Sequence, residues 1–139
     1  MTISTNSIKI HSKGENDLID LTQHILEFVK KSGVSKGIIT IFVSGSTGSI
    51  TTIEYEPGLI KDFPEMLRRI APDDLDYGHE KMWHDGNGHS HVKASLVGPS
   101  LVVPFFDGKL CLGRWQQIVF VEFDTRTRNR DLILQILGE

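Results

Sequence analysis

The chain has 139 residues, of which 39% are hydrophobic and 24% are charged, and this composition predicts a single globular domain over residues 1–139. Its net charge of −3 lacks the basic excess of proteins that bind nucleic acid or anionic membranes, so neither partner is expected. The only cysteine, Cys111, excludes an intrachain disulfide. No signal peptide precedes the domain, and no apolar run approaches the roughly 18 residues of a membrane span. Together these features predict a cytoplasmic protein.

The first half of the chain predicts strands alternating with helices. Residues 3–10 alternate loosely and predict an opening strand. Apolar residues recur on one helical face over residues 17–31, with Asn16 as the expected N-cap and Gly33 just past the end. The β-branched run at residues 37–43 then predicts a buried central strand.

The second half predicts mostly β structure. Residues 50–55 predict a strand and residues 59–70 a second helix, whereas residues 72–88 show no periodicity. From residue 91 onward the pattern predicts strands, with a two-residue hairpin at Asp107-Gly108. About seven strands and two helices predict an α+β fold that is mainly β, an antiparallel sandwich with the helices packed on it.

The segment GHSHVKASL, residues 88–96, carries the densest group of chemical side chains. If it is a strand, one face presents the alternate residues His89, His91, Lys93 and Ser95. Two histidines so placed can both bind one metal ion, and Lys93 would lie near an anionic phosphate. The alternative is a solvated strand face with two surface histidines. Because four of the six histidines lie within residues 79–91, we keep the binding site as a hypothesis beside that alternative.

Other polar segments are weaker candidates. The loop over residues 44–49 could hold a phosphate through its backbone N–H groups and the hydroxyls of Ser46 and Thr47, or serve only as a connection between strands. Arg114 is a further candidate for anion binding. The arginines that follow the last long strand form either a basic rim for phosphate, or a salt-bridged subunit interface or solvated edge; they are Arg126, Arg128 and Arg130.

Two runs of residues resemble the YjbQ-type family, which is associated with a secondary thiamine-phosphate synthase activity. They are Asp85-x-Asn87-x-x-x-His91-x-Lys93-x-Ser95-Leu96-x-Gly98-Pro99-Ser100 and Asp107-Gly108-x-Leu110-x-Leu112-Gly113-x-Trp115-Gln116. The resemblance implies a homotrimer of jelly-roll-like β-sandwiches with a histidine-lined metal site. The implied reaction joins hydroxymethylpyrimidine diphosphate to thiazole phosphate, giving thiamine phosphate and pyrophosphate.

The resemblance also implies roles for individual residues. His79 and His91 would be metal ligands, and Glu54 would orient a ligand or bind a cation. The pocket would be lined by Asp85, Asn87 and Lys93. The metal, zinc or magnesium, stays undecided.

One departure from the family leads to a specific hypothesis. Where the family commonly has a histidine followed by two threonines, this chain has Gly45-Ser46-Thr47. We hypothesise that His89 replaces the missing imidazole, so that His79, His89 and His91 form a three-nitrogen metal site.

Three functions stay open at this point. The first is the metal-dependent transferase, in which a cation and Lys93 would stabilise the departing pyrophosphate. The second is a metal-assisted hydrolase of a small phosphorylated or acyl compound. The third is a trimer that binds a metal or ligand without catalysis.

Overall fold

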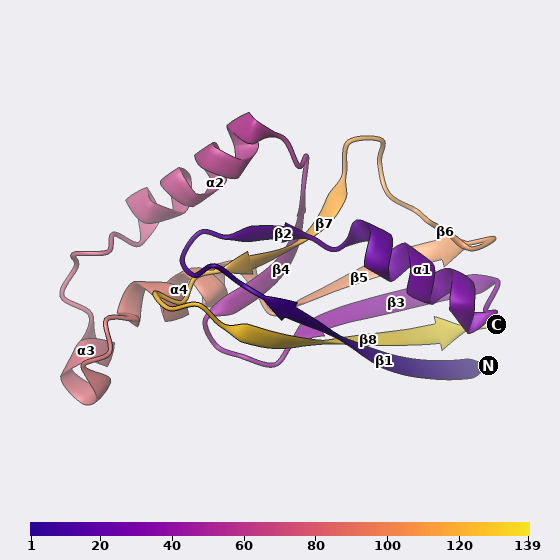
Figure 1. Ribbon diagram of the computed structural model, residues 1–139, viewed down its shortest axis with the longest axis horizontal. Helices are drawn as coiled ribbons and strands as arrows, with labels where there is room; N and C mark the ends of the chain where they lie inside the picture. Colours follow the sequence, from indigo (N-terminus) through magenta and orange to yellow (C-terminus); the bar gives the residue numbers. More distant parts are fainter.

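The computed structural model describes residues 1–139, which form two antiparallel sheets and four helices (Figure 1). The strands are β1 (Thr2–His11), β2 (Leu18–Asp20), β3 (Lys36–Val43), β4 (Gly48–Ile53), β5 (Ser100–Phe106), β6 (Lys109–Leu110), β7 (Gln117–Glu122) and β8 (Asn129–Gly138). The helices are α1 (Thr22–Ser32), α2 (Pro57–Ile70), α3 (Gly78–Trp83) and α4 (Gly88–Val97). The predicted mainly β sandwich is therefore confirmed, with two more helices than expected. None of the helices has the length and hydropathy needed to cross a membrane.

The two sheets differ in size and in burial. The larger has the strand order β1-β8-β3-β5-β6, and the smaller has the order β2-β7-β4. A core of fifteen buried residues joins the inner face of the larger sheet to helix α1 and to one face of the smaller sheet. A second cluster of six buried residues lies on the other face of the smaller sheet, where α2 and α4 contribute Leu67 and Ala94.

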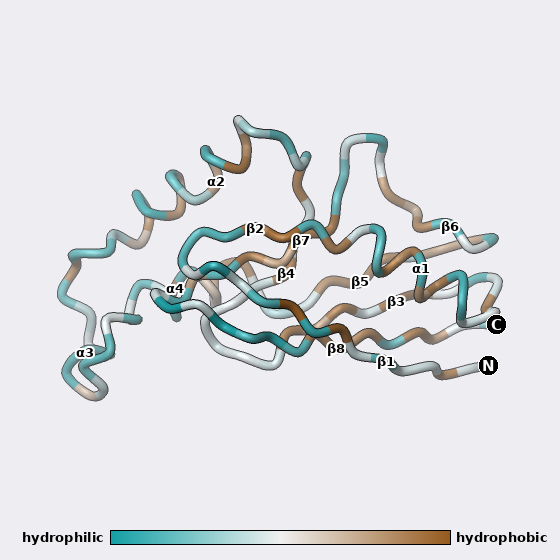
Figure 2. The backbone as a smooth tube through the Cα atoms, in the orientation of Figure 1, coloured by the Kyte–Doolittle hydropathy of each residue, from teal (hydrophilic) through white to brown (hydrophobic).

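Strand β7 lies in the middle of this arrangement and is buried on both faces. Ile118 and Phe120 point into the first cluster, whereas Val119 and Val121 point into the second. This position explains the unbroken apolar run of β7, which forms a hydrophobic stretch through the body in Figure 2. Each fully buried side chain of this kind contributes about 1.5–3 kcal/mol to folding.

The first predicted helix begins later than its periodicity suggested. Residues 18–20 pair with β7 as strand β2, and α1 starts at Thr22. Asn16 is not the N-cap, since it lies in a left-handed turn before β2. Gly33 ends the helix in the left-handed conformation with φ 70°, as predicted.

The second predicted helix is confirmed and begins two residues earlier, at Pro57. The Glu56 carboxylate accepts hydrogen bonds from the N–H groups of Gly58 and Leu59, which satisfies the first turn. Helix α2 and the short α3 project from the body of the sandwich (Figure 1).

The largest correction concerns residues 88–97, which form helix α4 and not a strand. A helix turns about 100° per residue, so side chains two apart point in nearly opposite directions. His89 and Lys93 therefore share one face, and His91 and Ser95 share the other. The predicted single polar face of four residues is wrong.

Three further observations concern a hairpin turn and the exposure of single side chains. The expected Asp107-Gly108 hairpin is confirmed between β5 and β6, with φ 48° and 67° at the two positions. Trp83 and Trp115 are 72% and 59% exposed. Cys111 is exposed as well.

Candidate functional site

The candidate site lies at the end of the sandwich opposite the two chain termini, near α4 in Figure 1. Four segments meet there: the loop between β3 and β4, the connection between α3 and α4, the start of α4, and the connection between β7 and β8. They enclose a cavity of about 290 Å³ lined by Gly45, Ser46, Thr47, Asp85, Asn87, His91, Asp124, Arg128 and Arg130. An adjoining hollow of about 190 Å³ shares Gly45, Ser46 and His91 and adds Ser95.

Three groups that bind metals in other proteins come together at this cavity. One ligand atom each of His79, Asp85 and His91 lies within 4.8 Å of the others. The imidazole rings of His79 and His91 have centroids 4.3 Å apart, and His79 Nε2 lies 3.2 Å from Asp85 Oδ1. All three side chains keep some contact with solvent, so a small molecule can reach them.

The connection between α3 and α4 is held in place by Glu80. Its carboxylate accepts hydrogen bonds from the N–H groups of Gly86 at 2.8 Å and Gly88 at 2.7 Å, and these bonds lower the pKa of Glu80. A side chain at Gly88 would collide with the Tyr77 ring, so glycine is required by that close approach. These two hydrogen bonds fix the backbone between His79 and His91.

Asp85 is held as an anion. The backbone N–H of Asn87 donates to its Oδ1 at 3.1 Å and is the main cause of its lowered pKa, to which the neighbouring His79 also contributes. An ionised carboxylate beside two imidazoles is a competent set of ligands for a cation.

Asn87 and Asp124 are buried residues that line the cavity. Asn87 is 1% exposed, and its Oδ1 accepts hydrogen bonds from the Ser90 hydroxyl and from the N–H and hydroxyl of Thr125. Burial raises the pKa of Asp124, but hydrogen bonds from the Arg126 N–H, the Arg128 guanidinium and the Thr47 hydroxyl lower it further than burial raises it. Asp124 is therefore a buried anion.

Two arginines, Arg128 and Arg130, also line the cavity. Arg128 Nε donates to Asp124 Oδ2 at 2.9 Å. Arg130 Nε donates to Oε2 of the fully buried Glu122 at 2.9 Å, and its Nη2 donates to Thr47 Oγ1 at 2.8 Å. The predicted salt-bridged role of these arginines is thus present, at the cavity and not at a solvated edge.

A second polar group lies on the other face of α4, away from this cavity. Lys93 is 1% exposed, and its Nζ donates to Asp73 Oδ1 at 2.9 Å, with Glu15 Oε1 at 3.5 Å and His89 Nδ1 at 3.4 Å. Burial raises the pKa of Asp73, but the hydrogen bond and the charge of Lys93 lower it by more. Glu15, Asp73 and His89 also bring three possible ligand atoms within 4.8 Å, but the Lys93 Nζ already lies among them.

The structure brings together only part of the predicted site. The hypothesis of a three-histidine group is wrong, because His89 lies with Glu15 and Asp73 while His79 and His91 lie with Asp85. Lys93 is absent from the residues that line the cavity, since helical spacing turns it toward Asp73.

Of the other predicted residues, some lie at the site and some do not. Ser46, Thr47 and Asn87 line the cavity, and Ser95 lines the adjoining hollow, where its hydroxyl donates to the His91 carbonyl. Glu54 and Arg114 line a separate, shallow hollow of about 420 Å³ beside Trp115. The structure thus separates those two residues from the histidines.

Several residues at the site were not predicted as site residues. Glu80, Glu122 and Asp124 act through hydrogen bonds to partners outside their own element, and no spacing rule for a helix or strand indicates such partners. The sequence did indicate Arg128 and Arg130, because these two basic residues alternate after a long strand.

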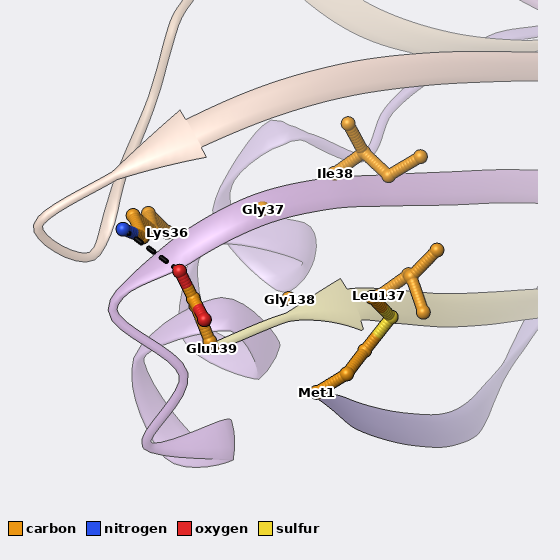
Figure 3. A pocket seen from close by; sticks show the side chains of 7 residues that line it. All are labelled: Met1, Lys36, Gly37, Ile38, Leu137, Gly138 and Glu139. Carbon is orange, nitrogen blue, oxygen red and sulfur yellow. Dashed lines mark ion pairs between the residues drawn. The ribbon is translucent and has the colours of Figure 1, made fainter.

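The largest hollow of the molecule lies at the other end of the sandwich and carries little chemistry. It measures about 450 Å³, and Figure 3 shows the Lys36–Glu139 ion pair at one side and Met1, Ile38 and Leu137 at the other. No histidine, cysteine or buried charge lines it. We therefore place the candidate site at the histidine cavity.

Comparison with known proteins agrees with the arrangement of strands and helices. The profile of the family described as UPF0047 protein YjbQ-like matches residues 6–139. The chain belongs to this YjbQ-like family. The UPF0047 protein of Methanothermobacter thermautotrophicus is 34% identical over 100% of this chain and 95% of its own length. The UPF0047 protein YugU of Bacillus subtilis is also 34% identical, over 95% of this chain and 98% of its own.

Solved structures of the YjbQ-like family have the same fold. The crystal structure of a YbjQ-like protein of unknown function from Sulfolobus solfataricus superposes with a TM-score of 0.89 at 32% identity, covering 99% of this chain and 100% of its own. The structure of an uncharacterized conserved protein of the family from Clostridium acetobutylicum superposes with a TM-score of 0.82 at 37% identity, covering 94% and 99%. The predicted fold class and the family resemblance are both confirmed.

Proposed function

We propose that this YjbQ-like protein is a metal-dependent enzyme acting on a small phosphorylated molecule, with a divalent cation held by His79, Asp85 and His91. The proposal rests on the meeting of two imidazoles and an ionised carboxylate within 4.8 Å, at a cavity that two arginines also line.

The donor set fits zinc better than magnesium. Zinc accepts imidazole nitrogen and carboxylate oxygen together, and catalytic sites commonly use three protein ligands and leave one position open. Magnesium prefers oxygen ligands in octahedral geometry, which two histidines do not provide. The proposed ligands are thus the corrected form of the predicted histidine set.

The reaction best matched by these groups is the transfer implied by the family resemblance. A bound divalent cation supplies positive charge that stabilises a departing pyrophosphate. The thiazole nitrogen forms the new C–N bond as the C–O bond to pyrophosphate breaks, so the protein needs no nucleophile. Ser46 and the two arginines would orient the phosphates, and His79, Asp85 and His91 would hold the cation beside them.

The direct test is an assay with both precursors. The metal-loaded protein should form thiamine phosphate and pyrophosphate in equal amounts from hydroxymethylpyrimidine diphosphate and thiazole phosphate. Asp85→Asn should reduce the rate about 10- to 100-fold, in keeping with the usual effect of altering a metal site. Glu54→Gln is the matched control, because Glu54 lies in a separate hollow. Absence of product with zinc, manganese and magnesium would overturn the transferase.

A hydrolase is the second candidate, favoured by the His79–Asp85 pair. Asp85 orients the imidazole through the 3.2 Å contact, as a carboxylate does for a general-base histidine. In that case pyrophosphate or phosphate would be released from one substrate with water alone. Product analysis in the presence and absence of thiazole phosphate distinguishes the two reactions.

We also propose that the protein associates with copies of itself, as the predicted homotrimer requires. The outer face of the larger sheet exposes apolar side chains on four strands, which are Ile3, Ile38, Phe42, Val102, Phe106, Ile133 and Leu137. The projecting α2–α3 segment exposes Met66, Ile70, Leu75, Met82 and Trp83. A ring of three copies needs two different surfaces on each chain, and this flat face and projecting segment meet that need.

The exposed thiol of Cys111 fits a reducing compartment, so a cytoplasmic location remains our proposal.

A further inference from the structure

The guanidinium of Arg130 has one nitrogen that the protein does not use. Its side chain is 10% exposed, Nε and Nη2 both bind Glu122, and Nη2 also binds Thr47. Nη1 donates no hydrogen bond to the protein, although the residue lines the 290 Å³ cavity. Two N–H donors are therefore directed away from the residues that hold the guanidinium.

Gly45 provides the space that this nitrogen occupies. A Cβ atom built at Gly45 would lie 2.7 Å from Arg130 Nη1 and 3.8 Å from Cζ, and it would meet no other atom within 4 Å. The backbone of Gly45 does not have the positive φ that requires glycine. Glycine at this position therefore lets Nη1 approach the loop closely. The backbone conformation of the loop does not itself require glycine.

The rest of the guanidinium is held firmly. Glu122 is fully buried and binds two of its nitrogens, and the Phe120 ring lies 5.9 Å from Cζ. A donor fixed in this way loses little conformational freedom when it binds an anion.

We propose that Arg130 Nη1 and the Gly45-Ser46 loop form an anion subsite that takes a phosphoryl oxygen of the substrate. The subsite rests on the proposed function, because it assigns a phosphoryl group of the substrate to the cavity that His91 and Asp85 also line. Arginine is suited to this task, since its planar N–H groups match the oxygens of a phosphate. The substrate class is then a phosphate monoester or diphosphate.

The subsite is tested by calorimetric titration of inorganic pyrophosphate into metal-free protein. The decisive variant is Gly45→Ala, because its Cβ would lie 2.7 Å from Nη1, so the guanidinium must shift, while Arg130 keeps its charge. We expect Gly45→Ala to weaken pyrophosphate binding about tenfold or more, as loss of a charge-assisted hydrogen bond does. Arg130→Lys should weaken it similarly, and thermal unfolding checks that both variants fold.

The matched control is Arg126→Gln, since Arg126 is 63% exposed and does not line the cavity. This variant should bind pyrophosphate within about twofold of the wild type. Unchanged binding by folded Gly45→Ala would overturn the subsite, as would absence of binding by the wild type. Because no metal is present, failure of the metal site would leave this result unaffected, and zinc content measured on Gly45→Ala should equal that of the wild type.

Discussion

At the scale of single residues, the site depends on side chains whose partners are distant in the sequence. Asp124 is bound by the hydroxyl of Thr47 and the guanidinium of Arg128, and it accepts a long 3.4 Å bond from Asn87. The histidines and Asp85 could be predicted, since their density in one segment is visible in the sequence. Their division into two groups could not, because it depends on which partners each side chain meets after folding.

The first prediction concerns Asp124. Asp124→Asn removes a buried anion from the Arg128 guanidinium, and we expect the free energy of unfolding at pH 7 to fall by about 2 kcal/mol. The lowered pKa of Asp124 means that its stabilisation is present above the ordinary aspartate pKa and is lost as the pH falls through the folded-state pKa. Urea unfolding from pH 7 down to pH 3 should therefore show a shallower acid loss in the variant.

Asp131→Asn is the control for that experiment. Asp131 is 66% exposed and lies 4.0 Å from the exposed Lys9, so its loss should change stability by less than about 0.5 kcal/mol. Equal effects of the two substitutions would contradict the role given to Asp124.

At the scale of elements, helix α4 explains why the sequence was misleading. Its alternation of polar and small or apolar residues fits a strand, and the usual apolar stripe of a helix is absent because one buried face carries His89 and Lys93. Pattern rules assume that buried positions are apolar. They fail here because the buried side chains of His89 and Lys93 replace part of the apolar face of the helix.

The second prediction separates the two faces of α4. Lys93→Met leaves Asp73 and Glu15 without their cation, so the free energy of unfolding should fall by about 3 kcal/mol. The metal content of the folded fraction should be unchanged, because Lys93 does not belong to the His91 group. Chemical denaturation and elemental analysis of the same sample measure both effects.

Ser95→Ala, on the other face, should change stability by about 1 kcal/mol or less, because its hydroxyl binds only the His91 carbonyl at the exposed surface. Loss of metal on Lys93→Met without unfolding would show that the division of α4 into two functional faces is wrong.

At the scale of the whole molecule, the strands of the sandwich could be predicted from the sequence more fully than the positions of helices α2 and α3. Strands β3, β7 and β8 were predicted because long apolar or alternating runs mark them, and the Asp107-Gly108 turn fixed one hairpin. The position of α2 and α3 could not be predicted. They project from the body, and their exposed apolar residues belong to the surface that we propose for self-association.

The third prediction tests self-association. Sedimentation velocity should find a trimer for the wild type, and the double substitution Phe42→Ser with Val102→Ser should shift it toward monomer. Each lost apolar contact of about 1.5 kcal/mol raises the dissociation constant about tenfold. Gln135→Ser, a polar change on the same sheet face, should leave the assembly intact. A wild-type monomer at all concentrations would contradict the proposal.

The central claim is that His79, Asp85 and His91 together bind one metal ion. Elemental mass spectrometry on untagged wild type, His91→Ala, His89→Gln and the exposed-site control His24→Ala tests it most directly. We expect about one zinc per chain in the wild type, in His89→Gln and in His24→Ala, and its loss in His91→Ala. Metal retained by His91→Ala, or no metal in any of the four proteins after reconstitution with zinc, would contradict it.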